Sequence, residues 1–311
     1  MATLYLLLMR GFGWIYYFAP RWLRRVMAST LGGFARLVGY RAAVIRQNLR
    51  FAFPGDAPEP VHQRTELIKQ FYQHFGRLGF EILMLFGPMR RYAEAQGKCG
   101  GIEHWERAKA AGRGVILLTS HTGSWEVAAA MGALVEQADV LLVSRHFKPE
   151  WLHAAIERWR KRCGVDATYE PRTLRDILAR LKRNGTVAIV LDQYTPPPVG
   201  VRVPFFGLPV GTNVAIAVLA KRTGARVLPF KNFRLPDGRV VVEIGSPVPW
   251  QVHDNPEVEL AINTAAYSAM IENQIREHPA QWLWSHRRFK GDLAPLRDGE
   301  WERGRQHQAP A

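Results

Sequence analysis

The chain has 311 residues, of which 47% are hydrophobic and 11% aromatic, a composition that excludes global disorder and suits one large α/β domain or two small ones. The 42 lysines and arginines exceed the 27 acidic residues and give a formal net charge of +15, so an anionic partner is expected: nucleic acid, a membrane surface or an acidic protein. The two cysteines, Cys99 and Cys163, lie far apart, which excludes a disulfide framework and a zinc-knuckle spacing.

The first segment, residues 4–19, is apolar and aromatic apart from Arg10, and the basic sequence Arg-Trp-Leu-Arg-Arg follows at 21–25. It is shorter than the ~20 residues of a full membrane span and lacks the charged start and cleavage site of a secretory signal. Its Trp and Tyr residues favour the lipid–water boundary. We therefore predict an interfacial or marginally spanning anchor whose basic flank faces anionic lipid on the cytoplasmic side, with an ordinary buried first helix as the alternative.

Helical periodicity continues over residues 21–51 and then over 61–86, where Gly87-Pro88 ends an amphipathic helix. Beyond this point, short apolar runs alternate with helical stretches. Strands are predicted at 115–118, 140–143, 187–191, 227–230 and 240–244. Helices are predicted at 124–137, 150–163, 173–183, 212–223 and 257–277.

The first four of these strands are nearly continuous hydrophobic runs, which is typical of strands buried on both faces of a largely parallel sheet. We therefore predict an α/β fold, with a central, mostly parallel sheet flanked by helices and an N-terminal helical, membrane-associated region. The predicted organisation is a membrane-anchoring helical region over 1–90, an α/β catalytic domain over 91–290 and a polar, poorly ordered tail over 291–311.

A candidate catalytic block, Ser-His-Thr-Gly-Ser-Trp-Glu at 120–126, directly follows one predicted strand and opens a helix. His121 is suited to act as a general base, with the carboxylate of Glu126 orienting it. Gly123 and Ser124 begin the helix, so their amides are expected to be unpaired and to stabilise an oxyanion. The pattern H-x-x-x-x-E is weak by itself and equally fits a histidine hydrogen-bonded within a turn. No motif with metal-ligand spacing is present.

Further blocks, taken together and in order, resemble the late lipid A acyltransferases (lauroyl and myristoyl transferases) of the lysophospholipid acyltransferase superfamily. The resemblance runs from about residue 39 to residue 290. Besides 120–126, the blocks are Arg46-Gln47-Asn48-Leu49 with Phe53-Pro54, Lys148-Pro149 leading to Trp159-Arg160, Leu191-Asp192-Gln193, Val203-Pro204-Phe205-Phe206-Gly207 with Pro209 and Thr212, Leu228-Pro229-Phe230, and the ten residues 281–290.

The resemblance implies an acyltransferase in which His121 and Glu126 form the catalytic dyad and His121 deprotonates a hydroxyl that attacks an acyl thioester. It also implies a set of substrate-binding residues. Arg160 and Asp192 would bind donor or acceptor phosphate, although a structural cap is the alternative for Asp192. Gly207 would shape the acceptor pocket, and Thr212 would join it or cap the next helix. Arg287 and Arg288 would meet phosphate or lipid head groups, or lie on the surface.

The resemblance further implies an acyl carrier protein thioester as donor, an anionic membrane lipid as acceptor and a place on the bacterial inner membrane with the catalytic part facing the cytoplasm. No metal, cofactor or covalent acyl-enzyme is expected. The net charge suits both the acidic carrier protein and the membrane.

Two segments depart from the family pattern, the proline-rich loop 194–200 and Arg-His-Phe at 145–147. They leave the acceptor open between a lipid A precursor and a lysophospholipid, lipoamino acid or glycolipid. Two other classes of function fit the sequence less well. A nucleic-acid-binding protein would need binding motifs that the sequence lacks, and an inactive membrane scaffold is disfavoured by the intact pair His121 and Glu126.

Overall fold

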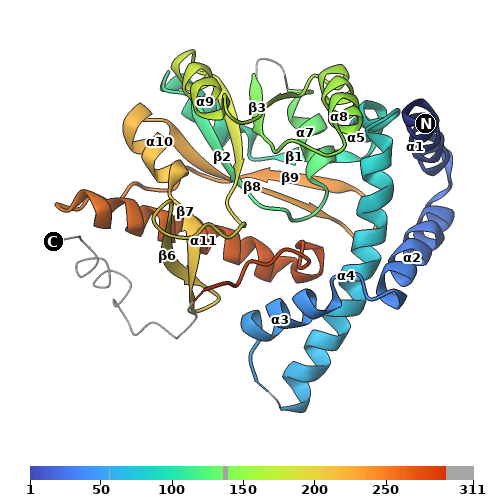
Figure 1. Ribbon diagram of the computed structural model, residues 1–311. Coiled ribbons are helices and arrows are strands. Elements are labelled where there is room, and N and C mark those ends of the chain that lie inside the picture. Colours follow the sequence, from blue (N-terminus) through green and yellow to red (C-terminus); the bar gives the residue numbers. More distant parts are fainter. Residues whose placement is uncertain (56, 136–138, 292–311) are drawn as a thin grey trace.

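A computed structural model describes residues 1–55, 57–135 and 139–291, so all but the first residue of the predicted tail lies outside the described residues. Figure 1 shows a central sheet with helices on both faces and a group of N-terminal helices along one side. The predicted fold class is therefore confirmed: the protein is α/β, with a mostly parallel sheet flanked by helices.

The main sheet of the described residues has seven strands in the order β1-β9-β8-β2-β5-β3-β4. Neighbouring strands are parallel except β8 and β9, which are antiparallel. The strands are β1 (Gly97–Gly100), β2 (Val115–Thr119), β3 (Val140–Val143), β4 (Asp166–Thr168), β5 (Thr186–Val190), β8 (Arg226–Arg234) and β9 (Val240–Ile244). A separate hairpin consists of β6 (Gly200–Phe205) and β7 (Leu208–Asn213).

The central strand β2 is buried on both faces, and its side chains alternate between two cores. Ile116 and Leu118 pack in the core shared with α9 (Thr173–Lys182), α10 (Ala215–Thr223) and α11 (Pro256–Glu277). Val115 and Leu117 pack on the opposite face, against α6 (Ile102–Ala110). This two-sided burial explains why β2 has no polar side of its own in the sequence.

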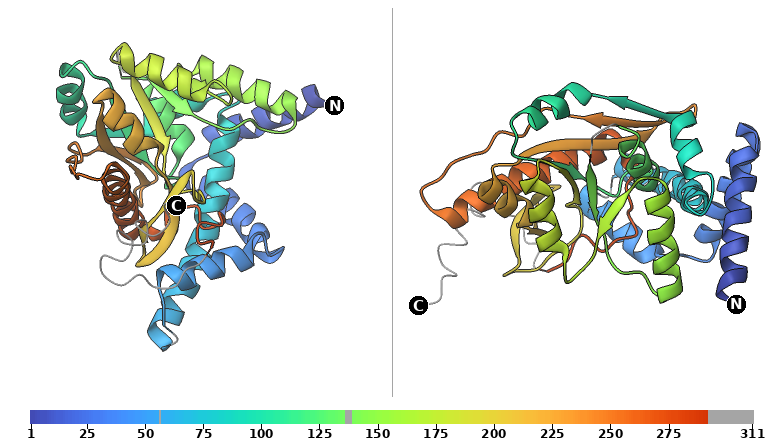
Figure 2. Two further views of the ribbon diagram at one scale, coloured as in Figure 1. Left: turned by 60° about the vertical axis from the view of Figure 1, so that its left-hand side comes forward. Right: turned by 90° about the horizontal axis from the view of Figure 1, so that it is seen from above.

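The N-terminal part consists of α1 (Ala2–Phe18), α2 (Arg21–Leu37), α3 (Ala42–Ala52) and the long α4 (Pro58–Met84), which runs beside the first two and continues into α5 (Met89–Gln96) (Figures 1 and 2). Glycines bring α2 and α4 close together. A Cβ on Gly32 would lie 2.0 Å from the carbonyl oxygen of Tyr72, and one on Gly76 would lie 2.0 Å from that of Ala28. Larger residues at Gly32 or Gly76 would therefore separate the two helices.

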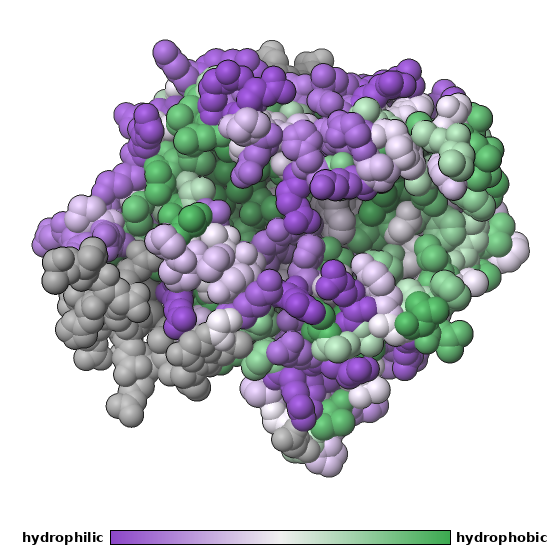
Figure 3. Space-filling model, viewed as in Figure 1, coloured by the Kyte–Doolittle hydropathy of each residue, from purple (hydrophilic) through white to green (hydrophobic). Residues whose placement is uncertain are grey.

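One side of this helical group carries exposed apolar side chains. Figure 3 shows hydrophobic residues gathered at the end of the molecule where Figure 1 places α1 and α2. The side chains of Leu4, Phe18, Trp22 and Phe34 are 60% to 73% exposed. Among the described residues, no helix has both the length and the apolar character needed to cross a membrane.

Several element boundaries differ from the sequence prediction. The helix predicted over 21–51 is interrupted between α2 and α3, where Gly39 and Arg41 have φ angles of 66° and 54°. The helix predicted to begin at residue 212 begins at Ala215, because Thr212 belongs to β7. The helix predicted over 124–137 is α7 (Trp125–Gly132), and residues 136–138 lie outside the described residues.

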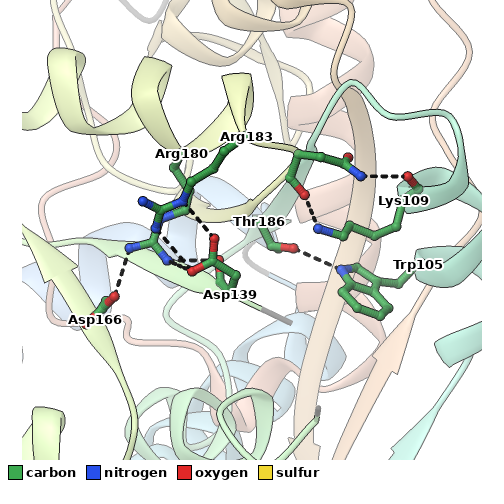
Figure 4. A network of polar contacts seen from close by, with 8 residues as sticks. Trp105, Lys109, Asp139, Asp166, Arg180, Arg183 and Thr186 are labelled. Atoms are coloured by element: carbon green, nitrogen blue, oxygen red, sulfur yellow. Dashed lines mark hydrogen bonds and ion pairs between the residues drawn. The ribbon is translucent and has the colours of Figure 1, made fainter. Parts of the chain in front are cut away.

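A polar network closes the amino ends of the central strands, at the opposite edge of the sheet from the candidate site (Figure 4). Arg180 of α9 forms ion pairs with Asp139, just before β3, and Asp166, the first residue of β4. Thr186, the first residue of β5, accepts a hydrogen bond from the indole of Trp105 at 3.0 Å. These contacts fix the strand starts and thereby the positions of the strand ends that carry the site.

Candidate active site

His121 and Asp192 meet because they follow neighbouring parallel strands. Strands β2 and β5 pair in register up to Thr119 and Val190, so the chain leaves both strands at the same edge of the sheet. Asp192 accepts two hydrogen bonds from His121, from ring Nδ1 at 2.9 Å to Oδ1 and from the backbone amide at 2.8 Å to Oδ2. In open α/β sheets the carboxyl ends of the strands are the usual place for a ligand site.

The His121–Asp192 contact controls the charge on both groups. Burial lowers the pKa of His121, but the negative charge of Asp192 and the hydrogen bond to it outweigh burial and raise the pKa above 6.5. Burial raises the pKa of Asp192, yet His121 and a hydrogen bond from Trp282 bring it far below its usual range. Asp192 is therefore ionised at neutral pH, accepts the Nδ1 hydrogen of His121 and leaves Nε2 as the basic nitrogen.

The segment around Trp282 holds this arrangement in place. Its indole Nε1 donates to Asp192 Oδ2 at 2.7 Å, while the amide of Leu283 donates to the His121 carbonyl at 3.0 Å. The amide of Gly123 donates to the carbonyl of Gln281 at 3.0 Å. This last bond corrects the prediction that the Gly123 amide is unpaired: a neighbouring segment has taken it, and it is not available to an oxyanion.

Gly123 is required at the turn after His121. Its φ is +64°, and a Cβ there would lie 2.5 Å from both the carbonyl and the side-chain oxygen of Asn232. The Gly123 carbonyl also contacts Nε2 of His74 at 3.2 Å. The next residue, Ser124, is the N-cap of α7, and its backbone amide has no hydrogen-bond partner among the described residues. Of the two predicted oxyanion donors, Ser124 therefore keeps a free amide.

Glu126 is paired with Arg160, not with the ring of His121. Arg160, on α8 (Glu150–Arg162), holds the carboxylate through Nε at 3.1 Å and Nη2 at 2.5 Å, and donates to Ser144 through Nη1 at 3.1 Å. Both charged side chains are buried, at 7% and 5% exposure. Glu126 contributes only a weaker, more distant charge to His121, so the direct contact that the sequence left open is made by Asp192.

Arg288 and Thr212 form a second buried arrangement. Arg288 is 1% exposed and donates to the carbonyls of Gln193 and Gly211, both at 2.9 Å, and to the hydroxyl of Thr212 at 2.8 Å. It therefore ties the loop after β5 to β7 and does not lie on the surface. Thr212 does not cap α10, since the side chain of Asn213 accepts the amide of Ala215 instead.

Gly207 and Arg287 lie apart from these contacts. Gly207 and Phe206 form the turn of the β6–β7 hairpin, with φ angles of 74° and 51°. Thr212 lies five residues along β7, ~17 Å from that turn at the usual rise of a strand, so the two predicted pocket residues are at opposite ends of the hairpin. Arg287 is exposed.

Two rings beside His121 were not predicted as site residues. Its ring centroid lies 5.2 Å from Trp125 in an edge-on contact and 5.3 Å from His286. Burial lowers the pKa of His286, and the neighbouring charge of His121 lowers it further, so His286 is neutral at neutral pH. Trp282 and His286 both lie within the block 281–290 that carries the family resemblance. This block was the signal in the sequence that could have identified them as site residues. Within the described residues, no group of His, Cys, Asp or Glu is placed to hold a metal ion.

Comparison with known proteins decides the family. The model of the bacterial lipid A biosynthesis acyltransferase family matches residues 2–291. The chain belongs to this family. The chain is 27% identical to a lipid A biosynthesis lauroyltransferase of Escherichia coli over 259 residues, 82% of this chain and 81% of that protein. This lipid A acyltransferase homologue is therefore an acyltransferase, as the sequence predicted.

Two further relatives differ in the acceptor that their names give. A lipid A biosynthesis palmitoleoyltransferase of Escherichia coli is 26% identical over 291 residues, 90% of this chain and 89% of that protein. A phosphatidylinositol mannoside acyltransferase of Mycobacterium tuberculosis is 29% identical over 201 residues, 64% of this chain and 61% of that protein. The acceptors of these relatives are thus chemically distinct, while acyl transfer is common to them.

Proposed function

We propose that this acyltransferase moves a fatty acyl chain from a thioester, carried by acyl carrier protein, to a hydroxyl of a lipid A precursor, with His121 as general base. The observation that carries the proposal is the partly buried His121–Asp192 contact at the carboxyl ends of β2 and β5. Asp192 holds the tautomer that leaves Nε2 basic, and no protein group among the described residues is hydrogen-bonded to that nitrogen.

The reaction then balances without a further group. Nε2 of His121 takes the proton of the acceptor hydroxyl as its oxygen attacks the thioester carbonyl. In this proposal the Ser124 amide at the start of α7 donates to the tetrahedral oxyanion. When the carbon–sulfur bond breaks, the imidazolium returns its proton to the leaving thiolate. Asp192 stays ionised throughout and stabilises the imidazolium.

In this proposal Glu126 acts indirectly. Its carboxylate fixes the guanidinium of Arg160, whose third nitrogen reaches Ser144 directly after β3, at the same edge of the sheet. The next residue, Arg145, is close enough to influence the charge of His121. Glu126 would thus contribute to the site by holding Arg160 of α8, the helix that forms one side of the crevice.

Membrane and carrier contacts are part of the same proposal. Exposed apolar side chains on α1 and α2 support association with the inner membrane, with the catalytic part facing the cytoplasm. The exposed Arg158, Lys161 and Arg162 of α8, around the buried Arg160, suit the acidic surface of an acyl carrier protein. The helical region 1–90 would be the anchor and 91–290 the catalytic domain.

A second acceptor class is supported by a specific observation. The Mycobacterium tuberculosis relative that acylates a phosphatidylinositol mannoside is about as similar to this chain as the lauroyltransferase is, although over a shorter stretch. The proline-rich loop 194–200 contacts the β6–β7 hairpin through Tyr194 and Thr212. A glycolipid acceptor is therefore the alternative.

The test is acyl transfer by the purified full chain in mixed micelles, using acyl carrier protein and coenzyme A thioesters of the same chain. The acceptors are a lipid A precursor, a phosphatidylinositol mannoside and a lysophospholipid. We expect the lipid A precursor and the carrier-protein donor to give the highest kcat/KM. His121→Ala should lower it by ~10²-fold or more, because general-base catalysis is lost.

His62→Ala is the matched control, since His62 is exposed on α4, and it should keep full activity. Full activity in His121→Ala would refute His121 as the base. Transfer only to the phosphatidylinositol mannoside or the lysophospholipid would leave the chemistry intact and replace the lipid A acceptor.

A further inference from the structure

A recess with an unusual concentration of arginine lies among the N-terminal helices, outside the catalytic crevice. Its empty space, open solvent at the mouth included, is about 340 Å³ and lies between α2, α4, α5 and the turn that joins β8 to β9. Five arginines line it: Arg21, Arg24 and Arg25 from α2, Arg77 from α4 and Arg234 from β8. We call it the basic recess.

The acidic groups at the basic recess are already neutralised. Glu81 forms a buried ion pair with Arg234, and Asp237 forms one with Arg239 at 2.5 Å. Arg234 is only 7% exposed, and its Nε has no hydrogen-bond partner among the described residues. Arg234 thus brings to the wall of the recess a guanidinium whose hydrogen-bonding capacity the fold does not use in full.

Four positive charges remain. Arg24 donates only to backbone carbonyls, those of Tyr16 and Tyr17 at the end of α1, and Arg25 reaches the carbonyl of Pro236 at 3.4 Å. Within the described part of the chain, no ion pair joins Arg21, Arg24, Arg25 or Arg77 to a carboxylate. Four guanidinium groups around one recess favour a multiply charged anion, and guanidinium forks match phosphate oxygens in particular.

The surroundings of the basic recess favour a lipid as the source of that anion. Trp22 and Val26 follow Arg21 and Arg25 by one residue each on α2, and they are 66% and 53% exposed. Phe18, at the end of α1, is 73% exposed. Apolar side chains that insert at the lipid–water boundary would thus place the arginines at the depth of the head groups.

We propose that the basic recess binds the phosphate monoester of an anionic membrane lipid. The dianionic monoester is favoured over a singly charged diester because four uncompensated charges face the recess. The site is also connected to the catalytic turn. Arg234 exchanges two backbone hydrogen bonds with the side chain of Gln281, at 2.8 and 3.0 Å, and the carbonyl of Gln281 holds the amide of Gly123. A lipid bound there would orient the crevice relative to the membrane.

Vesicle binding by the full chain tests the proposal without any acyl transfer, so its failure is separable from failure of the proposed function. Phosphatidylcholine vesicles are doped either with phosphatidic acid, a phosphate monoester, or with oleate, a carboxylate, at matched surface charge. The wild type should bind the phosphatidic acid vesicles about tenfold more tightly than the oleate vesicles, because charge-assisted bonds to phosphate add to general attraction.

In the double variant Arg21→Gln/Arg25→Gln, the ratio of the affinity for phosphatidic acid vesicles to that for oleate vesicles should fall close to one. The matched control, Arg36→Gln/Arg46→Gln, removes the same charge from exposed arginines of α2 and α3, so it should weaken binding to both vesicles and keep the ratio. All these side chains are exposed, so folding should be unaffected, which thermal unfolding checks.

Two results would overturn the proposal. One is an equal ratio in the two double variants, which would mean that only overall charge matters. The other concerns free phosphate. If inorganic phosphate alone, measured by isothermal titration, binds the wild type as tightly as the phosphatidic acid vesicles do, and loses that affinity in Arg21→Gln/Arg25→Gln, the recess takes free phosphate and not a lipid.

Discussion

The ring of His121 lies against a carboxylate, an indole and a second imidazole, and these neighbours act on its ionisation in different directions. Burial favours the neutral ring, whereas Asp192 favours the cation and prevails. His286, whose pKa is lowered by burial, adds no positive charge near neutral pH. His121, the base of the proposed mechanism, is therefore a stronger base than a free imidazole and is protonated at a higher pH.

The pH dependence of kcat/KM should show this balance. Because the base must be neutral, the acid limb of the wild-type profile should lie above pH 6.5, the ordinary value for histidine. In Asp192→Asn the stabilising charge is gone while burial remains, so the limb should move to lower pH. The rate on the plateau should also fall, by up to ~10⁴-fold, because the asparagine no longer selects the Nδ1–H tautomer.

Profiles from pH 5 to 9 on the purified enzyme would measure both effects. Asp254→Asn is the control, since Asp254 is exposed before α11, and its profile should overlay the wild type. An acid limb that stays in place in Asp192→Asn would show that Asp192 does not set the ionisation of the base.

At the scale of elements, α7 and α8 share an apolar core and are also joined by a buried ion pair. Glu126 and Arg160 are nearly inaccessible, and the guanidinium binds both carboxylate oxygens. Breaking one side of such a pair leaves an uncompensated charge and typically costs ~3–5 kcal/mol of unfolding free energy, whereas replacing both partners with apolar residues is often tolerated. The pair thus couples the turn of His121 to the basic helix α8.

A double-mutant cycle would measure this coupling. Glu126→Met and Arg160→Met should each lower the free energy of unfolding by ~3–5 kcal/mol, and the double variant should lose less than their sum. Denaturant unfolding in one detergent gives the four values. The exposed pair Arg90–Glu94, at 3.1 Å on α5, is the control cycle and should couple by less than ~0.5 kcal/mol.

Activity of the same variants separates structure from chemistry. If the double variant recovers stability and acyl transfer together, Glu126 and Arg160 serve only to hold the site. If stability returns without transfer, one of them also contacts substrate, as the family resemblance implies. If Glu126→Met and Arg160→Met are each as stable as the single variants of the surface pair, the buried pair does not stabilise the fold.

The elements also show what could be read from the sequence. Strands with continuous apolar runs, such as β2 and β3, were predicted because burial on both faces leaves that signature. The short edge strands β1 (Gly-Lys-Cys-Gly) and β4 (Asp-Ala-Thr) carry no such run, and the hairpin β6–β7 contains prolines in both strands, so these were missed. The antiparallel pairing of β8 and β9 follows from their short connection, which leaves no room for the crossover that a parallel pair needs.

The candidate site, too, could be predicted from the sequence only in part. His121 was predicted because it directly follows a buried strand, and Asp192 because it matches the family pattern, but their contact requires β2 and β5 to be neighbours, which sequence order does not reveal. Glu126 was favoured by its closeness in sequence, yet its position in the first turn of α7 directs it to α8. Pairing of the Gly123 amide depended on a segment more than a hundred residues away, Gln281.

At the scale of the whole molecule, the net positive charge and the exposed apolar side chains are both features that suit contact with an anionic lipid surface. The formal net charge of +15 would attract the chain to anionic surfaces over a range of about 8–10 Å at physiological salt, but by itself it would not hold the protein at a fixed depth in a membrane. Apolar insertion is insensitive to salt. On α1, Leu4, Leu8, Phe12 and Ile15 recur at helical spacing and are 49% to 60% exposed, which gives one continuous apolar stripe.

Removing this stripe should therefore weaken binding to uncharged membranes. Leu8→Ser/Phe12→Ser/Ile15→Ser should reduce partitioning onto phosphatidylcholine vesicles by at least ~10-fold, since each buried apolar side chain is worth on the order of 1 kcal/mol or more. Its unfolding free energy should change little because these side chains already face outward. Leu174→Ser/Val199→Ser/Val252→Ser is the control, because these three exposed residues lie outside the N-terminal helices. Unchanged partitioning of the α1 variant would mean that the stripe does not insert into the membrane. If the wild type is a dimer and the α1 variant is not, the stripe is a contact between copies of the chain.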